Sequence, residues 1–182
     1  MPGIGPRSAE RIALWIVRAR SDQPEQISRA IAETRQAVHP CTLCGFFATG
    51  EICDICADSS RSAELLCVVE QATDILPLEK TSAFRGHYHS LGGKISPLDH
   101  IGPEDLRIRE LLERVEREKI SEIIFALPAD VEGEATTNYI VDLLKSKPVM
   151  LTRIARGIPA GGGLESVDEL TLSAALSGRT KL

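Results

Sequence analysis

The chain has 182 residues, of which 43% are hydrophobic, so it can form one or two small folded domains and is not a disordered chain. Its formal net charge is −5, which excludes a protein that binds nucleic acid through a generally basic surface. Aromatic residues make up only 4% of the chain, which argues against an aromatic platform for stacking bases.

The first 40 residues predict a helical arm. Pro6 suits the first turn of a helix, and apolar residues recur at helical spacing over residues 12–17. Residues 21–24 (SDQP) interrupt the pattern, and a second apolar stripe then runs from Ile27 to Val38. We therefore expect two short helices.

The start of the first helix is a candidate site for a phosphate group. The turn PGIGP places two glycines before the helix, where free backbone N–H groups can hold an anion. Arg7 and Arg11 lie one helical turn apart and could reinforce that contact. A glycine-rich helix cap with two solvated arginines explains the same residues equally well.

Four cysteines form the most specific motif of the chain, with the spacing Cys41-x2-Cys44-x8-Cys53-x2-Cys56. Four thiolates at this spacing can surround zinc as a tetrahedron, and a site with four protein ligands has no open position for catalysis. We therefore predict a structural zinc site. A pair of disulfides, free buried thiols and an iron–sulfur cluster are the alternatives.

Residues beyond a polar, serine-rich linker (57–64) alternate between apolar strands and amphipathic helices, which predicts a mainly parallel α/β sheet. The expected fold class is thus a multi-part mixture of α/β and α+β: a helical arm, a zinc finger, an α/β sheet and a C-terminal helix. The expected strands are 65–70, 122–127 and 149–155, the expected helices are 71–80, 104–118, 133–147 and 165–177, and residues 86–103 are expected to form a loop rich in glycine and proline.

Acidic side chains follow two of the expected strands. Glu70 ends the first, while Asp130, Glu132 and Glu134 follow the second. Carboxylates at the carboxyl ends of parallel strands can gather around Mg²⁺. Alternatively, Glu132 and Glu134 only favour the start of a helix.

The order of these parts resembles the RecR family of bacterial recombination mediators. The resemblance rests on PGIGPRSAERIA, the four cysteines, LLCVVE, YHSLGGKISPLDHIGPEDL, ALPADVEGEATTNYI and TRIARGIPAGGGLESVDELTL, and it covers essentially the whole chain. It implies five parts: a helix-hairpin-helix arm (1–40), a zinc finger (41–56), a linker (57–64), a Toprim domain (65–155) and a C-terminal oligomer contact (156–182). The first helix of the hairpin motif is expected to be missing, because Met1 already lies in the turn.

The resemblance also bears on the acidic residues. A catalytic Toprim domain has one Glu after its first strand and an Asp-x-Asp after a later one. Glu70 matches the Glu, but alignment on Glu132-Gly133-Glu134 puts Pro128 at the first Asp and Asp130 at the second. We therefore expect Mg²⁺ to bind weakly at best, and we expect a scaffold that binds and is not an enzyme, with catalysis weak or absent. A Toprim-type, metal-dependent DNA-processing enzyme is the alternative.

The function that the resemblance implies is mediation of recombinational DNA repair in the bacterial cytoplasm, at the nucleoid. The implied partners are single- and double-stranded DNA without sequence preference, RecO, RecF and further copies of the chain, and the implied outcome is RecA loading. Arg7, Arg11 and, more weakly, Lys94 are the candidate DNA contacts. The loop 128–135 has three acids and no base, so we expect it to bind RecO instead of DNA. The family's tetrameric ring could be reduced to a dimer here by the missing helix.

Overall fold

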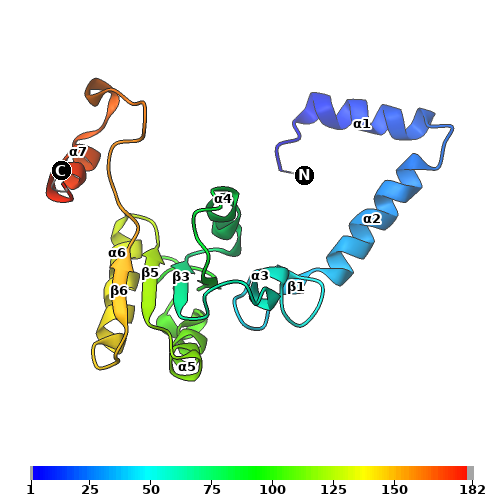
Figure 1. Ribbon diagram of the computed structural model, residues 1–182. Helices are drawn as coiled ribbons and strands as arrows, with labels where there is room; N and C mark the ends of the chain where they lie inside the picture. Colours follow the sequence, from blue (N-terminus) through cyan, green and yellow to red (C-terminus); the bar gives the residue numbers. More distant parts are fainter. Residues whose placement is uncertain (1, 180–182) are drawn as a thin grey trace.

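A computed structural model describes residues 2–179 and shows the mixed α/β fold that the sequence predicts (Figure 1). Two helices, α1 (Pro6–Arg18) and α2 (Gln23–Ala37), form an arm that extends away from the rest of the molecule. Pro24 stands in the first turn of α2, so the SDQP segment contains the start of α2, while α1 already ends at Arg18. Neither helix contains a buried residue. No helix within residues 2–179 is long and apolar enough to cross a membrane.

A small cysteine-rich unit connects the arm to the sheet. Strands β1 (His39–Pro40) and β2 (Phe47–Ala48) pair antiparallel, and the short helix α3 (Asp54–Ala57) follows them. We call this unit, residues 39–57, the zinc knuckle. The buried residues of its own small cluster are Ala48 and three cysteines, Cys41, Cys44 and Cys53, so its stability must come from its cysteines and from the neighbouring sheet.

The sheet has four parallel strands in the order β4-β3-β5-β6: β3 (Leu65–Val69), β4 (His87–Ser90), β5 (Glu122–Ala126) and β6 (Met150–Arg153). The sequence analysis missed β4 and assigned its residues to a loop. The strand is only four residues long and contains two histidines, so it lacks the apolar run that reveals the other strands. Three of its residues, Tyr88, His89 and Ser90, are nevertheless buried, because β4 pairs with β3 and Tyr88 packs in the smaller apolar cluster of the sheet. The buried guanidinium of Arg114 donates to the Tyr88 carbonyl oxygen at 2.7 Å.

The helices of the sheet region begin and end slightly differently from the prediction. They are α4 (Ile75–Lys80), α5 (Ile108–Glu118) and α6 (Val131–Leu144), and α7 (Glu169–Ser177) follows the sheet. Three short 3-10 turns stand before helices: Ala72–Asp74, Pro103–Asp105 and Leu164–Ser166. The second of them delays the start of α5 relative to the prediction. Left-handed backbone at Lys119 ends α5.

Alternate residues of β3 face two apolar clusters, as expected for a strand buried on both sides. Leu66 and Val68 belong to a large cluster that also contains residues of α5, β5 and α6. Cys67 and Val69 belong to a smaller one, against which Phe46 of the zinc knuckle packs. Burial raises the pKa of the Cys67 thiol to about 12, which marks it as a core side chain. The zinc knuckle therefore shares one of the two cores of the sheet.

Candidate zinc centre and nucleic-acid interface

The four knuckle cysteines converge on one point. Their sulfur atoms all lie within 4.8 Å of one another, and Cys41, Cys44 and Cys53 are buried. The sulfur atoms of Cys44 and Cys53 are 3.6 Å apart, which is far longer than the ~2.05 Å of a disulfide bond. The structure thus presents four free thiols positioned to bind zinc, as the spacing predicts.

Backbone N–H groups turn toward the same sulfurs. The N–H of Phe46 donates to the Cys44 sulfur at 3.4 Å, and that of Cys53 donates to the Cys41 sulfur at 3.3 Å. Gly45 makes the required tight turn with a φ of +77°, a conformation that glycine adopts without strain. Such N–H donors stabilise thiolate charge, so the loop is built to hold anionic sulfur.

Without a metal, these thiols cannot all ionise. A hydrogen bond from the Cys56 thiol lowers the pKa of Cys44 to about 5, whereas burial raises that of Cys53 to about 11. The neighbouring sulfurs thus oppose one another's ionisation. A divalent cation allows several of these thiols to ionise together, because its charge compensates several thiolates at once.

Donors from the sheet region hold the zinc knuckle through hydrogen bonds to the backbone carbonyls of the knuckle. The N–H of Ser90, at the end of β4, donates to the Cys44 carbonyl at 2.8 Å. The guanidinium of Arg107 donates to the carbonyls of Thr42 at 3.0 Å and Leu43 at 3.3 Å. Sequence reasoning missed Arg107, because it lies far along the chain from the cysteines and belongs to no motif.

The four acids of the predicted site have different contacts in the structure. Asp130 is the N-cap of α6, and its Oδ1 accepts from the Gly133 N–H at 2.7 Å. Gly133 has no room for a side chain, since a Cβ atom would lie 2.2 Å from the Pro128 carbonyl oxygen. The segment from Pro128 to Gly133 is thus a close-packed helix start.

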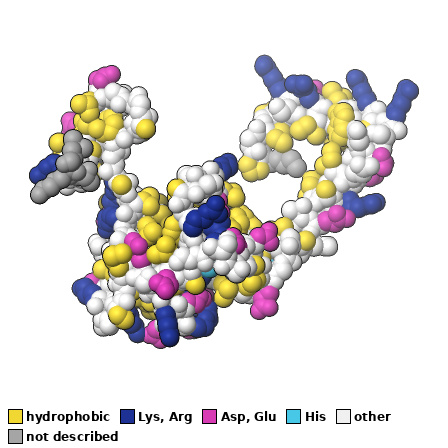
Figure 2. Space-filling model, in the orientation of Figure 1, with side chains coloured by type: hydrophobic (Ala, Val, Ile, Leu, Met, Phe, Trp, Pro, Cys, Tyr) yellow, Lys and Arg dark blue, Asp and Glu magenta, His cyan; other side chains and the backbone are white. Residues whose placement is uncertain are grey.

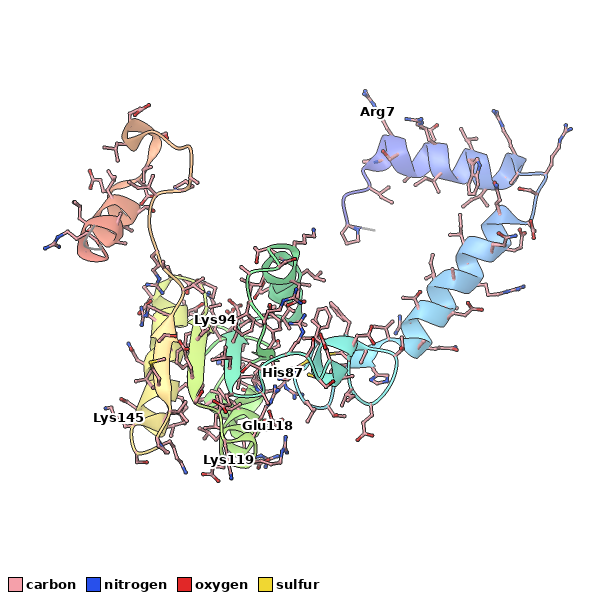
Figure 3. The ribbon with its side chains drawn as sticks, viewed as in Figure 1. Arg7, His87, Lys94, Glu118, Lys119 and Lys145 are labelled. Carbon is pink, nitrogen blue, oxygen red and sulfur yellow. The ribbon has the colours of Figure 1, made fainter. Side chains whose placement is uncertain are left out.

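Lys94 lies between two of the predicted acids. Its ammonium donates to Asp130 Oδ2 and lies 3.2 Å from Glu132 Oε2. The remaining oxygen of Glu132 accepts from the Ser96 hydroxyl at 2.6 Å. The Asp130 bond raises the pKa of Lys94 to about 12, and Lys94 in turn lowers the pKa of Asp130. Lys94, a predicted DNA contact, is therefore engaged with the acidic loop (Figure 3).

The other two acids have different surroundings. Glu134 pairs with Arg156 and, at 3.2 Å, with Arg153, both of which follow or end β6. Glu70 follows β3, where burial raises its carboxyl pKa. The expectation of an uncompensated acidic loop was therefore wrong: its bases come from distant parts of the chain, where a count along the sequence does not find them.

Within residues 2–179, the knuckle cysteines are the one group of three or more Cys, His, Asp or Glu side chains that lie close enough to share a metal ion. Glu70, Asp130, Glu132 and Glu134 do not converge in this way. The acids are thus not arranged as a ligand set for a divalent cation, and an ammonium group stands between two of them.

The arm presents an open helix start and a basic face. Gly5 is the N-cap of α1 and offers no side chain to its free N–H groups, and Gly3 has a φ of +74°. Arg7 and Arg11 are exposed, and no ion pair among the described residues involves either of them. Figure 3 shows Arg7 pointing away from the rest of the molecule. Helical spacing also places Arg18 on this face, which the sequence analysis did not note.

An apolar side of α1 borders the arginines and is exposed. Ile12, Trp15 and Ile16 are 41%, 42% and 49% exposed. In Figure 2, hydrophobic side chains follow the inner side of the arm, while Lys and Arg side chains project from its outer side. Ile27 and Ile31 continue the apolar surface on α2, and each is about half exposed.

Four family models match successive parts of the chain. They describe a RecR helix-hairpin-helix (residues 1–35), a RecR zinc finger domain with four cysteines (38–58), a Toprim domain (64–155) and a RecR C-terminal segment (157–180). The Toprim match contains all four strands of the sheet.

Full-length relatives agree with these matches. A protein named "Recombination protein RecR" from Acidothermus cellulolyticus is 47% identical over 100% of this chain and 92% of its own length. A protein of the same name from Moorella thermoacetica has the same identity and coverage, and one from Streptomyces coelicolor is 44% identical over 100% of this chain and 92% of its own.

Proposed function

The chain belongs to the RecR family of recombination proteins, and on that premise we propose that it is a DNA-binding mediator of recombinational repair that acts with RecO and RecF in RecA loading. The observation that supports DNA binding most strongly is the basic face of α1. Arg7 and Arg11 stand there without ion-pair partners among the described residues, beside a helix start with free N–H groups.

The contacts are with phosphates. Backbone N–H groups at a helix start and arginine side chains both bind phosphate oxygens, and neither reads base edges in this arrangement. Binding is therefore independent of sequence and extends to single and double strands. It falls steeply with salt, because each neutralised phosphate releases counterions.

A second copy of the chain covers the exposed apolar surfaces. The arm exposes Ile12 and Ile16, and the C-terminal α7 exposes Leu170 and Leu176, at 84% and 69%. These surfaces lie at opposite ends of the molecule, so contacts through both would join more than two copies, and in this proposal the copies close into a ring (Figure 1). Such a ring, a tetramer in the family pattern, can enclose DNA with the arginines of α1 facing inward.

RecO binds at the acidic loop in this proposal. Because Glu134 is already paired with Arg153 and Arg156, basic groups of the partner must compete with these arginines instead of meeting bare acids. Glu134→Gln should therefore slow association with RecO in a salt-dependent way and leave DNA binding unchanged. Glu113→Gln, on α5, is the matched control.

The decisive experiment compares two double variants in DNA-binding titrations at several salt concentrations. Arg7→Ala with Arg11→Ala should weaken all DNA sequences alike and reduce the salt slope by about 2. Arg109→Ala with Arg117→Ala removes the same charge from exposed positions of α5, 85% and 59% exposed, and should have little effect. Equal losses in the two double variants would refute the placement of DNA on α1.

A Toprim-type enzyme is the competing function. It is supported by the Toprim match and by Glu70 directly after β3. Incubation of the protein with nicked and gapped DNA in Mg²⁺ or Mn²⁺ separates the two functions. Turnover that Glu70→Ala abolishes would establish the enzyme and contradict a purely binding role.

A further inference from the structure

The Lys94 ammonium holds the acidic loop together at the place where the Toprim resemblance implies a divalent cation. We propose that Lys94 is a built-in cation that takes the place of this ion, so that the chain excludes Mg²⁺ and Mn²⁺ from Asp130 and Glu132. Asp130 and Glu132 belong to the loop at which we propose that RecO binds, but cation binding there is measured on the chain alone, without DNA or RecO.

Each carboxylate oxygen of this pair already lies against a hydrogen-bonding group. Asp130 Oδ1 accepts from the Gly133 N–H at 2.7 Å, and Glu132 Oε1 shares the single Ser96 hydroxyl proton, at 2.6 Å, with Asp99 Oδ2, at 2.8 Å. The other two oxygens face the Lys94 ammonium. A divalent cation would thus have to displace Lys94 or break the N-cap of α6.

The chemistry of the two cations explains why the ammonium fits better. Mg²⁺ demands near-octahedral oxygen ligands at about 2.0–2.1 Å, usually with several waters. Asp130 and Glu132 face one another across a single ammonium. Asp99 lies near Glu132 through the Ser96 hydroxyl, but no three acids among the described residues lie close enough to share a metal ion. Lys94 supplies one positive charge and up to three hydrogen bonds, which suits two carboxylates whose remaining oxygens contact other groups.

The position of Lys94 is itself constrained. It follows Gly92 and Gly93 in the loop after β4, and its side chain is only 21% exposed, less than those of Asp130 (48%) and Glu132 (30%). The next residue reinforces the contact, since the Ile95 N–H donates to the Thr136 hydroxyl of α6 at 2.9 Å. The loop is therefore attached to α6 at two points, and Lys94 supplies the charged one.

Removal of the ammonium should create the missing metal site. In the zinc-loaded full chain, Lys94→Met leaves Asp130 and Glu132 without their counter-charge, so they should bind Mn²⁺ at least about tenfold more tightly than the parent. Lys94→Arg keeps the charge and should bind no better than the parent. Mn²⁺ is a suitable probe, because cysteine thiolates prefer zinc and because free Mn²⁺ is counted directly by electron paramagnetic resonance.

A double variant shows whether Asp130 is a ligand of any Mn²⁺ site that the Lys94 variants gain. Lys94→Met with Asp130→Asn should lose the gained affinity, while asparagine still caps α6. Lys94→Gln repeats the test in case the methionine variant does not fold, and circular dichroism verifies folding. The proposal is overturned if the parent binds Mn²⁺ and loses it on Asp130→Asn, or if folded Lys94→Met and Lys94→Gln gain no Mn²⁺ binding.

Discussion

The sheet region and the flanking helices differ in what their side chains contact. Every buried residue among those described lies between Cys41 and Leu144, in the zinc knuckle and the sheet region, which we call the body. The arm (α1 and α2) and α7 contain none, although all three expose large apolar side chains. The body completes its packing within one chain, whereas the arm and α7 must complete theirs against other molecules. Substitutions should therefore affect stability in the body and assembly or DNA binding in the arm.

The largest expected effect is the loss of zinc. Removal of the metal by a chelator, or Cys41→Ser, should destabilise the whole body and lower Tm by about 10 °C or more, because the binding energy of a structural zinc is folding energy and Phe46 connects the zinc knuckle to the core of the sheet. Cys67→Ala is the matched control and should retain one zinc per chain. Elemental analysis with calorimetry provides both readouts. Absence of zinc from freshly purified parent protein would contradict the metal assignment.

The next largest effect concerns the Arg107 hydrogen bonds that connect the sheet region to the zinc knuckle. Arg107→Met removes the donors to Thr42 and Leu43 and leaves two carbonyls unsatisfied, so the free energy of unfolding should fall by about 1–3 kcal/mol. Arg109→Met, nearby on α5 and 85% exposed, should change it by less than about 0.5 kcal/mol. Denaturant titrations measure the free energy of unfolding of both variants. Equal losses for Arg107→Met and Arg109→Met would contradict a role for Arg107 in holding the zinc knuckle.

Acid should weaken the body through Glu79. Hydrogen bonding from Arg61 lowers the pKa of Glu79, whose other contact is the Tyr88 hydroxyl at 2.7 Å. A lowered folded-state pKa means that this contribution is present above the unfolded-state value and is lost as the pH falls through the folded-state one. Glu79→Gln should therefore cost about 1 kcal/mol at neutral pH and flatten the loss of stability below pH ~4.5. A parallel pH dependence in parent and variant would refute this.

The smallest effect on stability is expected in the arm. Ile16→Ser should reduce the assembled mass in solution but change the unfolding of the body by less than about 0.5 kcal/mol, because Ile16 touches no core. Val17→Ser, at an adjacent position that is 82% exposed, should leave the mass unchanged. Light scattering measures the mass, and an unaltered mass for Ile16→Ser would place the contact elsewhere.

The same contrast explains what the sequence could predict. The cysteine spacing and the apolar runs of β3, β5 and β6 are local patterns, and they predicted the zinc knuckle and three of the four strands. Strand β4 has no such pattern, because it is four residues long and two of them are histidines; its pairing with β3 is a contact between distant parts of the chain. The roles of Lys94 and Arg107 also depend on contacts between distant parts of the chain. Spacing along the sequence carries no signal for such pairs.

The central claim is that the body packs within one chain and the arm packs between chains. Amide hydrogen exchange, measured on the zinc-loaded protein over a series of dilutions, tests it most directly. Protection of α1 and α2 should fall as the assembly dissociates, while protection of β3 and β5 stays constant. Protection of the arm that does not change with protein concentration, or protection of β3 that falls together with it, would contradict the account.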